Sequence, residues 1–153
     1  MRTTSPKTFI SHAHDSVELV ERILDLSRRL RDDGVDTILD LYVQSPRDGW
    51  ARWVDRHIRD DDFVLMVCTE RYYRHVTGEP VEEQGLGVRW QGLLIYNSLY
   101  SGESQGKFIP VVFAEADRRF VPMPLIGGTL YNVASDEGYE ALYRHLTDQA
   151  AVL

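Results

Sequence analysis

The sequence is poor in cysteine, in long apolar runs and in positive charge. Its single cysteine, Cys68, excludes a disulfide within the chain, and its place in the apolar run FVLMVC predicts a buried, inert thiol. No apolar run approaches the ~20 residues of a membrane-spanning helix. The first residues, MRTTSPKT, lack the apolar core of a signal peptide, so we expect a cytoplasmic protein.

The charge balance disfavours two classes of partner. Lys and Arg number 17 against 24 Asp and Glu, which gives a net charge of -7. Nucleic acids and anionic membranes require a concentrated positive surface, so we expect no contact with either. The densest basic cluster, Arg28, Arg29 and Arg31, has the spacing of a solvated helix face.

Size and alternation of pattern indicate one α/β domain. The chain has 153 residues, 43% of them apolar and 27% charged, as in ordinary globular proteins. We predict strands over 8–13, 36–41, 63–68, 107–113 and 129–133, and helices over 16–31, 50–58, 88–100 and 136–149. This order predicts a flavodoxin-like five-stranded parallel sheet, in strand order 2-1-3-4-5, with helices on both faces. The domain should fill residues 1–153, with a core of about 7–148.

The first helix carries its own boundary signals. Asp15 is the predicted N-cap, Glu18 lies in the acidic first turn, and Gly34 stops the helix. In an open parallel sheet, ligands bind at the carboxyl ends of the strands near the switch in strand order. The stretch SHAHD, which follows the first strand, is therefore expected at the functional edge.

The same stretch offers two histidines and an aspartate, so a metal site has to be considered. The H-x-H spacing of His12 and His14 occurs in metal hydrolases built on eight-stranded barrels, but such a barrel typically needs about 250 residues. A catalytic metal needs about three protein ligands, and His75 is the one plausible third histidine. We therefore expect no metal. A Ser-His-Asp triad is disfavoured as well, because Ser11, His12 and Asp15 are too close in sequence.

Taken together, several segments resemble the TIR superfamily and specifically its SEFIR branch. The resemblance rests on FISHAHDS, on the run from Gly34 to Tyr73, and on GLGVRWQG, KFIPVVF and GYEALYRHLT, in this order. It implies the fold predicted above. It also implies one of two activities: cleavage of NAD+ in bacterial immune defence on self-assembly, or homotypic protein contacts without catalysis, filaments included. Bacterial members commonly form one end of a larger effector protein with a separate sensor.

The resemblance also implies a catalytic glutamate after a tryptophan in the third helix. Cleaving nicotinamide from ribose passes through an oxocarbenium-like transition state, which one carboxylate can stabilise without a metal or cofactor. Here the corresponding pair is Trp90 and Gln91, so the expected charge is missing. Two explanations stay open: a natural non-catalytic member, or a laboratory replacement of glutamate, which the intact surrounding pattern favours. Glu82, Glu83 and Glu103 lie outside the motif.

The remaining candidate residues are expected around NAD+, as substrate. Backbone N–H groups of Ser11, His12 and Ala13, at the start of a helix, suit a phosphate. Arg47 could meet a phosphate or be a plain surface arginine, and Trp50 could stack on a base or pack in the core. The predicted lining of the nucleotide site is Ser11, His12, Ala13, Asp40, Tyr42, Arg47, Trp50 and Trp90 around Gln91.

Overall fold

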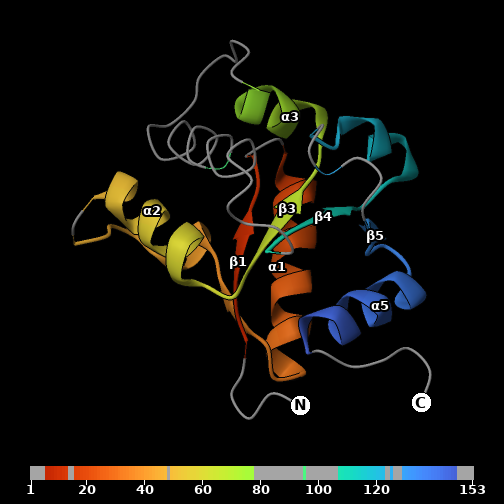
Figure 1. Ribbon diagram of the computed structural model, residues 1–153, viewed down its shortest axis with the longest axis horizontal. Helices are drawn as coiled ribbons and strands as arrows, with labels where there is room; N and C mark the ends of the chain where they lie inside the picture. The colour runs from red at the N-terminus through yellow and green to blue at the C-terminus, as the bar shows by residue number, and fades with distance from the viewer. Residues whose placement is uncertain are drawn as a thin grey trace.

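A computed structural model describes residues 6–13, 16–47, 49–77, 95, 107–122, 125 and 129–147. One parallel sheet runs through the molecule in the order β2-β1-β3-β4-β5 (Figure 1). The predicted fold class and strand order are confirmed. The strands are β1 (Lys7–Ser11), β2 (Asp36–Ile38), β3 (Phe63–Val67), β4 (Phe108–Val112) and β5 (Tyr131–Asn132).

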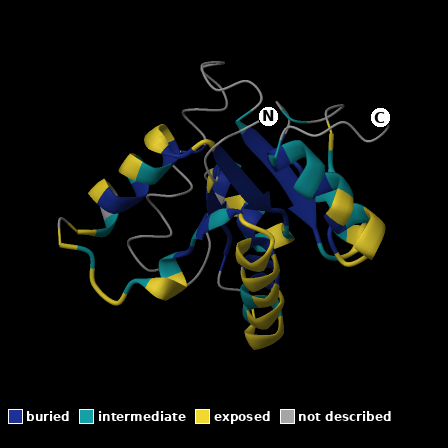
Figure 2. Cartoon of the chain, turned by 90° about the horizontal axis from the view of Figure 1, so that it is seen from below, coloured by how far each residue is buried: buried dark blue, intermediate teal, exposed yellow. Residues whose placement is uncertain are grey.

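Helices cover both faces of the sheet and bury its central strands. Every residue of β3 and of β4 is buried, as expected for continuous apolar runs within a parallel sheet. Figure 2 shows the strands as a buried layer between helices whose outer surfaces are exposed. The helices are α1 (Val17–Asp32), α2 (Trp50–Asp60), α3 (Glu70–Thr77) and α5 (Asp136–Leu146).

The core is divided by the sheet into two clusters. Neighbouring residues of a strand point to opposite faces, so Phe9 and Ile10 belong to different clusters. Phe9 packs with Trp53 of α2 and Tyr72 of α3. Ile10 packs on the face covered by α1 and α5, where Ile23 and other apolar residues of these helices are buried. Each of the described helices α1, α2, α3 and α5 thus contributes apolar residues to the core.

The start of α1 differs from the prediction. Ser16, and not Asp15, is the N-cap, and its hydroxyl accepts a hydrogen bond from the backbone N–H of Leu19 at 3.1 Å. Serine and aspartate are both good caps, so the residue that directly precedes the first helical turn takes the role. The acidic first turn with Glu18 is confirmed. Gly34 has φ of 95° just beyond the helix, as its predicted stop requires.

The chain leaves β2 earlier than predicted. The strand ends at Ile38, and residues Asp40–Tyr42 form a 3-10 helix, η1, so the expected strand over 36–41 is too long. The turn closes through a backbone hydrogen bond from Tyr42 N–H to the Leu39 carbonyl at 3.1 Å. Leu39 remains fully buried. The buried Leu39 therefore extends the apolar pattern of β2 beyond the end of the strand, which is why the prediction was too long.

The elements after β3 also differ in part from the predicted ones. Helix α3 and a 3-10 helix, η2 (Glu115–Phe120), were not predicted. The last strand and helix begin and end within the predicted ranges but are shorter. Of the predicted helix over 88–100, only Ile95 is among the described residues, and it is helical and fully buried.

Candidate functional site

The carboxyl ends of β1 and β2 bring His12 and Asp40 together. The two strands are adjacent and parallel, with Phe9 paired to Ile38, so the chain leaves both strands at the same edge of the sheet. The Nε2 atom of His12 lies 3.0 Å from an oxygen of Asp40. The histidine side chain is 0% exposed and that of Asp40 is 11% exposed. The histidine is therefore inside the protein, while the carboxylate reaches the surface.

Both nitrogens of the His12 ring have acceptors as partners. The Nδ1 atom lies 3.1 Å from the carbonyl oxygen of Ala13, and Nε2 faces the Asp40 carboxyl group. A carbonyl and a carboxylate can only accept, so each contact is a hydrogen bond when the nitrogen that it involves carries the proton. The ring thereby ties the loop after β1 to η1 and fixes the direction of the Asp40 side chain.

Ser11, the last residue of β1, is directed into the core below this edge. Its hydroxyl accepts a hydrogen bond from the Tyr72 phenol of α3 at 2.9 Å. Burial raises the pKa of Tyr72 far above its usual range, and the hydrogen bond to Ser11 opposes this only in part, so the phenol keeps its proton. Tyr72 is 2% exposed and belongs to the core.

Tyr42 is directed to α1 and not to the His12 ring. Its hydroxyl lies 2.6 Å from that of Ser27, which in turn lies 2.6 Å from the hydroxyl of Thr37 in β2. The Arg31 guanidinium sits 4.2 Å from the centre of the Tyr42 ring and donates to the Thr37 carbonyl at 2.7 Å. The Tyr42 ring remains substantially exposed. This network fixes η1 from its other side.

Arg47 and Trp50 follow in the loop and at the start of α2. Arg47 is exposed. Trp50 is half-buried against the core cluster of α2 and meets Trp53 edge to face, with ring centres 5.5 Å apart. Gly49 precedes the helix with φ of 87°, a conformation that favours glycine. The packing of Trp50 agrees with the core alternative weighed above.

Other predicted site residues lie outside the described residues. These are Trp90 and Gln91, as well as His14 and Asp15 of the HAHD stretch. The side chain of His75 is not described either. Within the described ranges, no group of three or more His, Cys, Asp or Glu side chains is placed to hold a metal ion.

The contact of His12 with Asp40 was not predicted, although both residues were assigned to the site. The signal was present in the sequence: each follows a strand end, and neighbouring parallel strands end at one edge. What obscured it was the predicted extension of β2 through Leu41, because a strand would carry Asp40 past this edge.

Comparison with known proteins identifies the family. The family model of the SEFIR domain matches residues 6–146. This chain belongs to the SEFIR family. The fold of a prokaryotic SEFIR domain, determined by crystallography, superposes with a TM-score of 0.68 at 26% sequence identity, covering 93% of this chain and 99% of that one. The comparison with curated proteins gave no match. No helix in the described part of this SEFIR domain is long and apolar enough to cross a membrane.

Proposed function

We propose that this SEFIR domain is a bacterial immune effector that cleaves NAD+ between nicotinamide and ribose when it self-assembles. In this chain the activity is low because residue 91 is glutamine. The domain works in the cytoplasm as part of a larger protein with a separate sensor. Membership of the SEFIR family supports the domain type, and SEFIR domains generally mediate homotypic interactions.

The observation that carries the proposal is the buried His12 ring behind the Asp40 carboxyl group. This pair lies where β1 and β2 end, beside the point at which the strand order reverses, and such points bind nucleotides in open α/β sheets. A carboxylate there can accept hydrogen bonds from ribose hydroxyls, as in dinucleotide-binding folds. Asp40 has the required chemistry, because a carboxylate offers several acceptor positions and its side chain reaches the surface.

The proposed reaction needs one more negative charge, at residue 91. Nicotinamide leaves as a neutral molecule, so no proton has to be delivered to it. Positive charge develops on the ribose, and a carboxylate at residue 91 would stabilise it. Gln91 keeps the shape and hydrogen-bonding capacity of glutamate without the charge. Loss of such a group typically lowers the rate by about 10²–10³-fold.

The test is to make Gln91→Glu and measure nicotinamide released from NAD+ at protein concentrations and crowding that induce assembly. We expect at least about a 10²-fold rise over the parent chain. Gln44→Glu is the matched control, because Gln44 is exposed and the change adds the same charge elsewhere. No release from folded, assembled Gln91→Glu protein would refute the enzymatic proposal.

A second function is favoured by the glutamine itself. A SEFIR domain without the catalytic charge could act as a homotypic interaction module with no turnover. In that case Gln91→Glu would self-associate like the parent chain and release no nicotinamide. The same experiment therefore separates the two functions, provided that association and release are measured on one sample.

A further inference from the structure

Helix α1 carries a stripe of alternating charge along one side. Glu18, Arg22, Asp25 and Arg29 are spaced by four, three and four residues, so they lie in one line along the helix. All four are exposed. The stripe lies beside the buried side of α1, to which Leu26 belongs. From the amino to the carboxyl end of the helix, the four charges are negative, positive, negative and positive.

This order of charges is complementary to itself when read in reverse. If two copies of α1 lie antiparallel about a two-fold axis, Glu18 of one copy meets Arg29 of the other, and Arg22 meets Asp25. Each contact occurs twice, so all four residues of both stripes face a residue of opposite charge. We propose that this stripe is a self-association surface and that its occupant is α1 of a second copy of the chain.

Pairing within the helix does not account for the stripe. Such a pattern could serve ion pairs four residues apart, Glu18 with Arg22 and Asp25 with Arg29. The Asp25 carboxylate instead lies 3.1 Å from Arg28, and both side chains are more than two-thirds exposed. Throughout the described ranges, neither Glu18 nor Arg22 has an ion-pair partner. Two of the four charges thus have no counterpart within their own described chain.

Arg29 has an intramolecular contact that still allows the proposed one. Its guanidinium lies 3.7 Å from the centre of the Tyr139 ring and 3.3 Å from an oxygen of Asp136 in α5. The Asp136 side chain is 88% exposed, so this ion pair is a weak surface contact. A guanidinium has five N–H donors, which leaves some for a carboxylate of a second copy. Stacking on Tyr139 meanwhile limits the positions that Arg29 can take.

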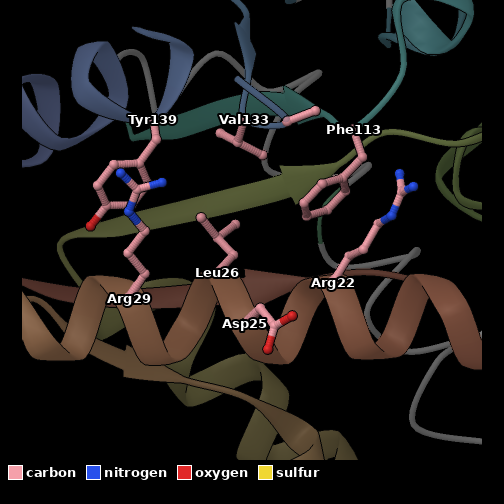
Figure 3. Close-up of a pocket in the computed structure, with 8 residues that line it drawn as sticks. Arg22, Asp25, Leu26, Arg29, Phe113, Val133 and Tyr139 are labelled. Carbon is pink, nitrogen blue, oxygen red and sulfur yellow. The ribbon is translucent and has the colours of Figure 1, made fainter. Parts of the chain in front are cut away.

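A hollow beside the stripe gives the second helix apolar surface to cover. It has a volume of about 420 Å³ and lies between α1 and the ends of β4 and β5. Figure 3 shows Arg22 and Arg29 rising from α1 on either side of Leu26, with Phe113 and Val133 directed toward them from across the hollow. Apolar side chains on the floor and guanidinium groups at the rim suit an amphipathic, partly acidic helix. In the amino-terminal half of α1, Glu18 of the stripe supplies the acidic group for that role.

The contact is small, which sets the strength to be expected. From Glu18 to Arg29 the stripe spans about 16 Å of helix. Stable interfaces bury about 1,200–2,000 Å², more than one short helix pair provides. We therefore expect a weak dimer that forms at high local concentration and dissociates as salt rises. The inference rests on the proposed function only in assuming that the chain self-associates. Its test does not depend on NAD+ cleavage.

The test is sedimentation equilibrium of the purified chain over a range of concentrations, at low and high salt. Arg22→Glu places a carboxylate opposite Asp25 in both halves of the dimer, and we expect the dissociation constant to rise at least about tenfold. The double variant Arg22→Glu/Asp25→Arg exchanges the two signs and should restore association to within about threefold of the parent. Arg52→Glu, an equal charge change at an exposed site on α2, is the matched control and should have little effect.

Four results would overturn the proposal: a parent chain that stays monomeric at the highest concentration, an unaffected Arg22→Glu variant, a double variant as weak as the single one, or equal weakening by Arg52→Glu. A parent chain that associates while Arg22→Glu has no effect would place self-association on another surface. That outcome leaves the proposed NAD+ cleavage on assembly untouched, so the two proposals fail separately.

Discussion

Replacing Asp40 by alanine should destabilise the protein through the histidine that it leaves behind. The His12 side chain is 0% exposed and its Nε2 atom faces Asp40 at 3.0 Å. A buried hydrogen-bonding group that loses a partner costs about 1–3 kcal/mol. Because the Asp40 side chain is 11% exposed, water can partly take its place beside His12. We therefore expect Asp40→Ala to lower the free energy of unfolding by about 2 kcal/mol.

Urea unfolding, followed by circular dichroism, measures this loss. Asp40→Asn is the matched control, because its amide oxygen can still accept from Nε2, and it should cost less than about 1 kcal/mol. Combining Asp40→Ala with His12→Leu removes the stranded ring, so the double-mutant cycle should show a coupling of at least about 1 kcal/mol. Equal losses for Asp40→Ala and Asp40→Asn, or a coupling near zero, would refute the role assigned to this pair.

Two further predictions concern buried titratable groups. Burial lowers the pKa of His145, whose Nδ1 lies 2.7 Å from the Tyr131 hydroxyl, so folding favours the neutral ring. This contribution to stability is complete above the ordinary pKa of 6.5 and is lost as the pH falls below that value. In the His145→Gln variant, the urea midpoint should therefore change less between about pH 7.5 and pH 5 than in the parent chain. An equal change in both proteins would contradict this. Burial is the main cause that raises the pKa of the Cys68 thiol to about 12. The thiol of the folded protein should therefore resist iodoacetamide at about pH 8 and react only after unfolding. Rapid labelling of the folded protein would disprove its burial.

The sheet could be predicted from the sequence largely because two of its inner strands, β3 and β4, have no polar side chains. FVLMVC and FIPVV are continuous apolar runs, and only a strand covered on both faces needs such a run. Alternation with amphipathic helices then left few possible topologies, and the predicted strand order is confirmed. The predicted helices over 16–31 and 136–149 are present as α1 and α5, and each buries apolar residues against the sheet.

The missing and misplaced elements have local causes. Helix α3 has only eight residues, Glu70–Thr77, which is too short for a clear helical period. The end of β2 was misjudged because Leu39 is buried beyond the strand, so burial alone did not mark where the backbone turned. The N-cap was assigned one residue early, since Asp15 and Ser16 are both suitable caps and sequence gives little to separate neighbours.

The sequence predicted which edge of the sheet the stretch after β1 reaches, but not the contacts made there. Topology placed His12 at the carboxyl end of β1, and the structure shows that it contacts Asp40, which follows β2. The burial of the His12 ring could not be read from the sequence, because it depends on how residues distant in the chain pack around the ring. The role of Gln91 rests on the family resemblance.

Nicotinamide release by the Gln91→Glu variant tests the central claim most directly. Proton NMR of NAD+ incubated with the concentrated variant distinguishes free nicotinamide from the intact dinucleotide, and the parent chain and Gln44→Glu serve as references. The account predicts release at least about 10²-fold faster than with the parent chain. Intact NAD+ in the presence of a folded and self-associated Gln91→Glu variant would contradict it and leave this SEFIR domain as an interaction module.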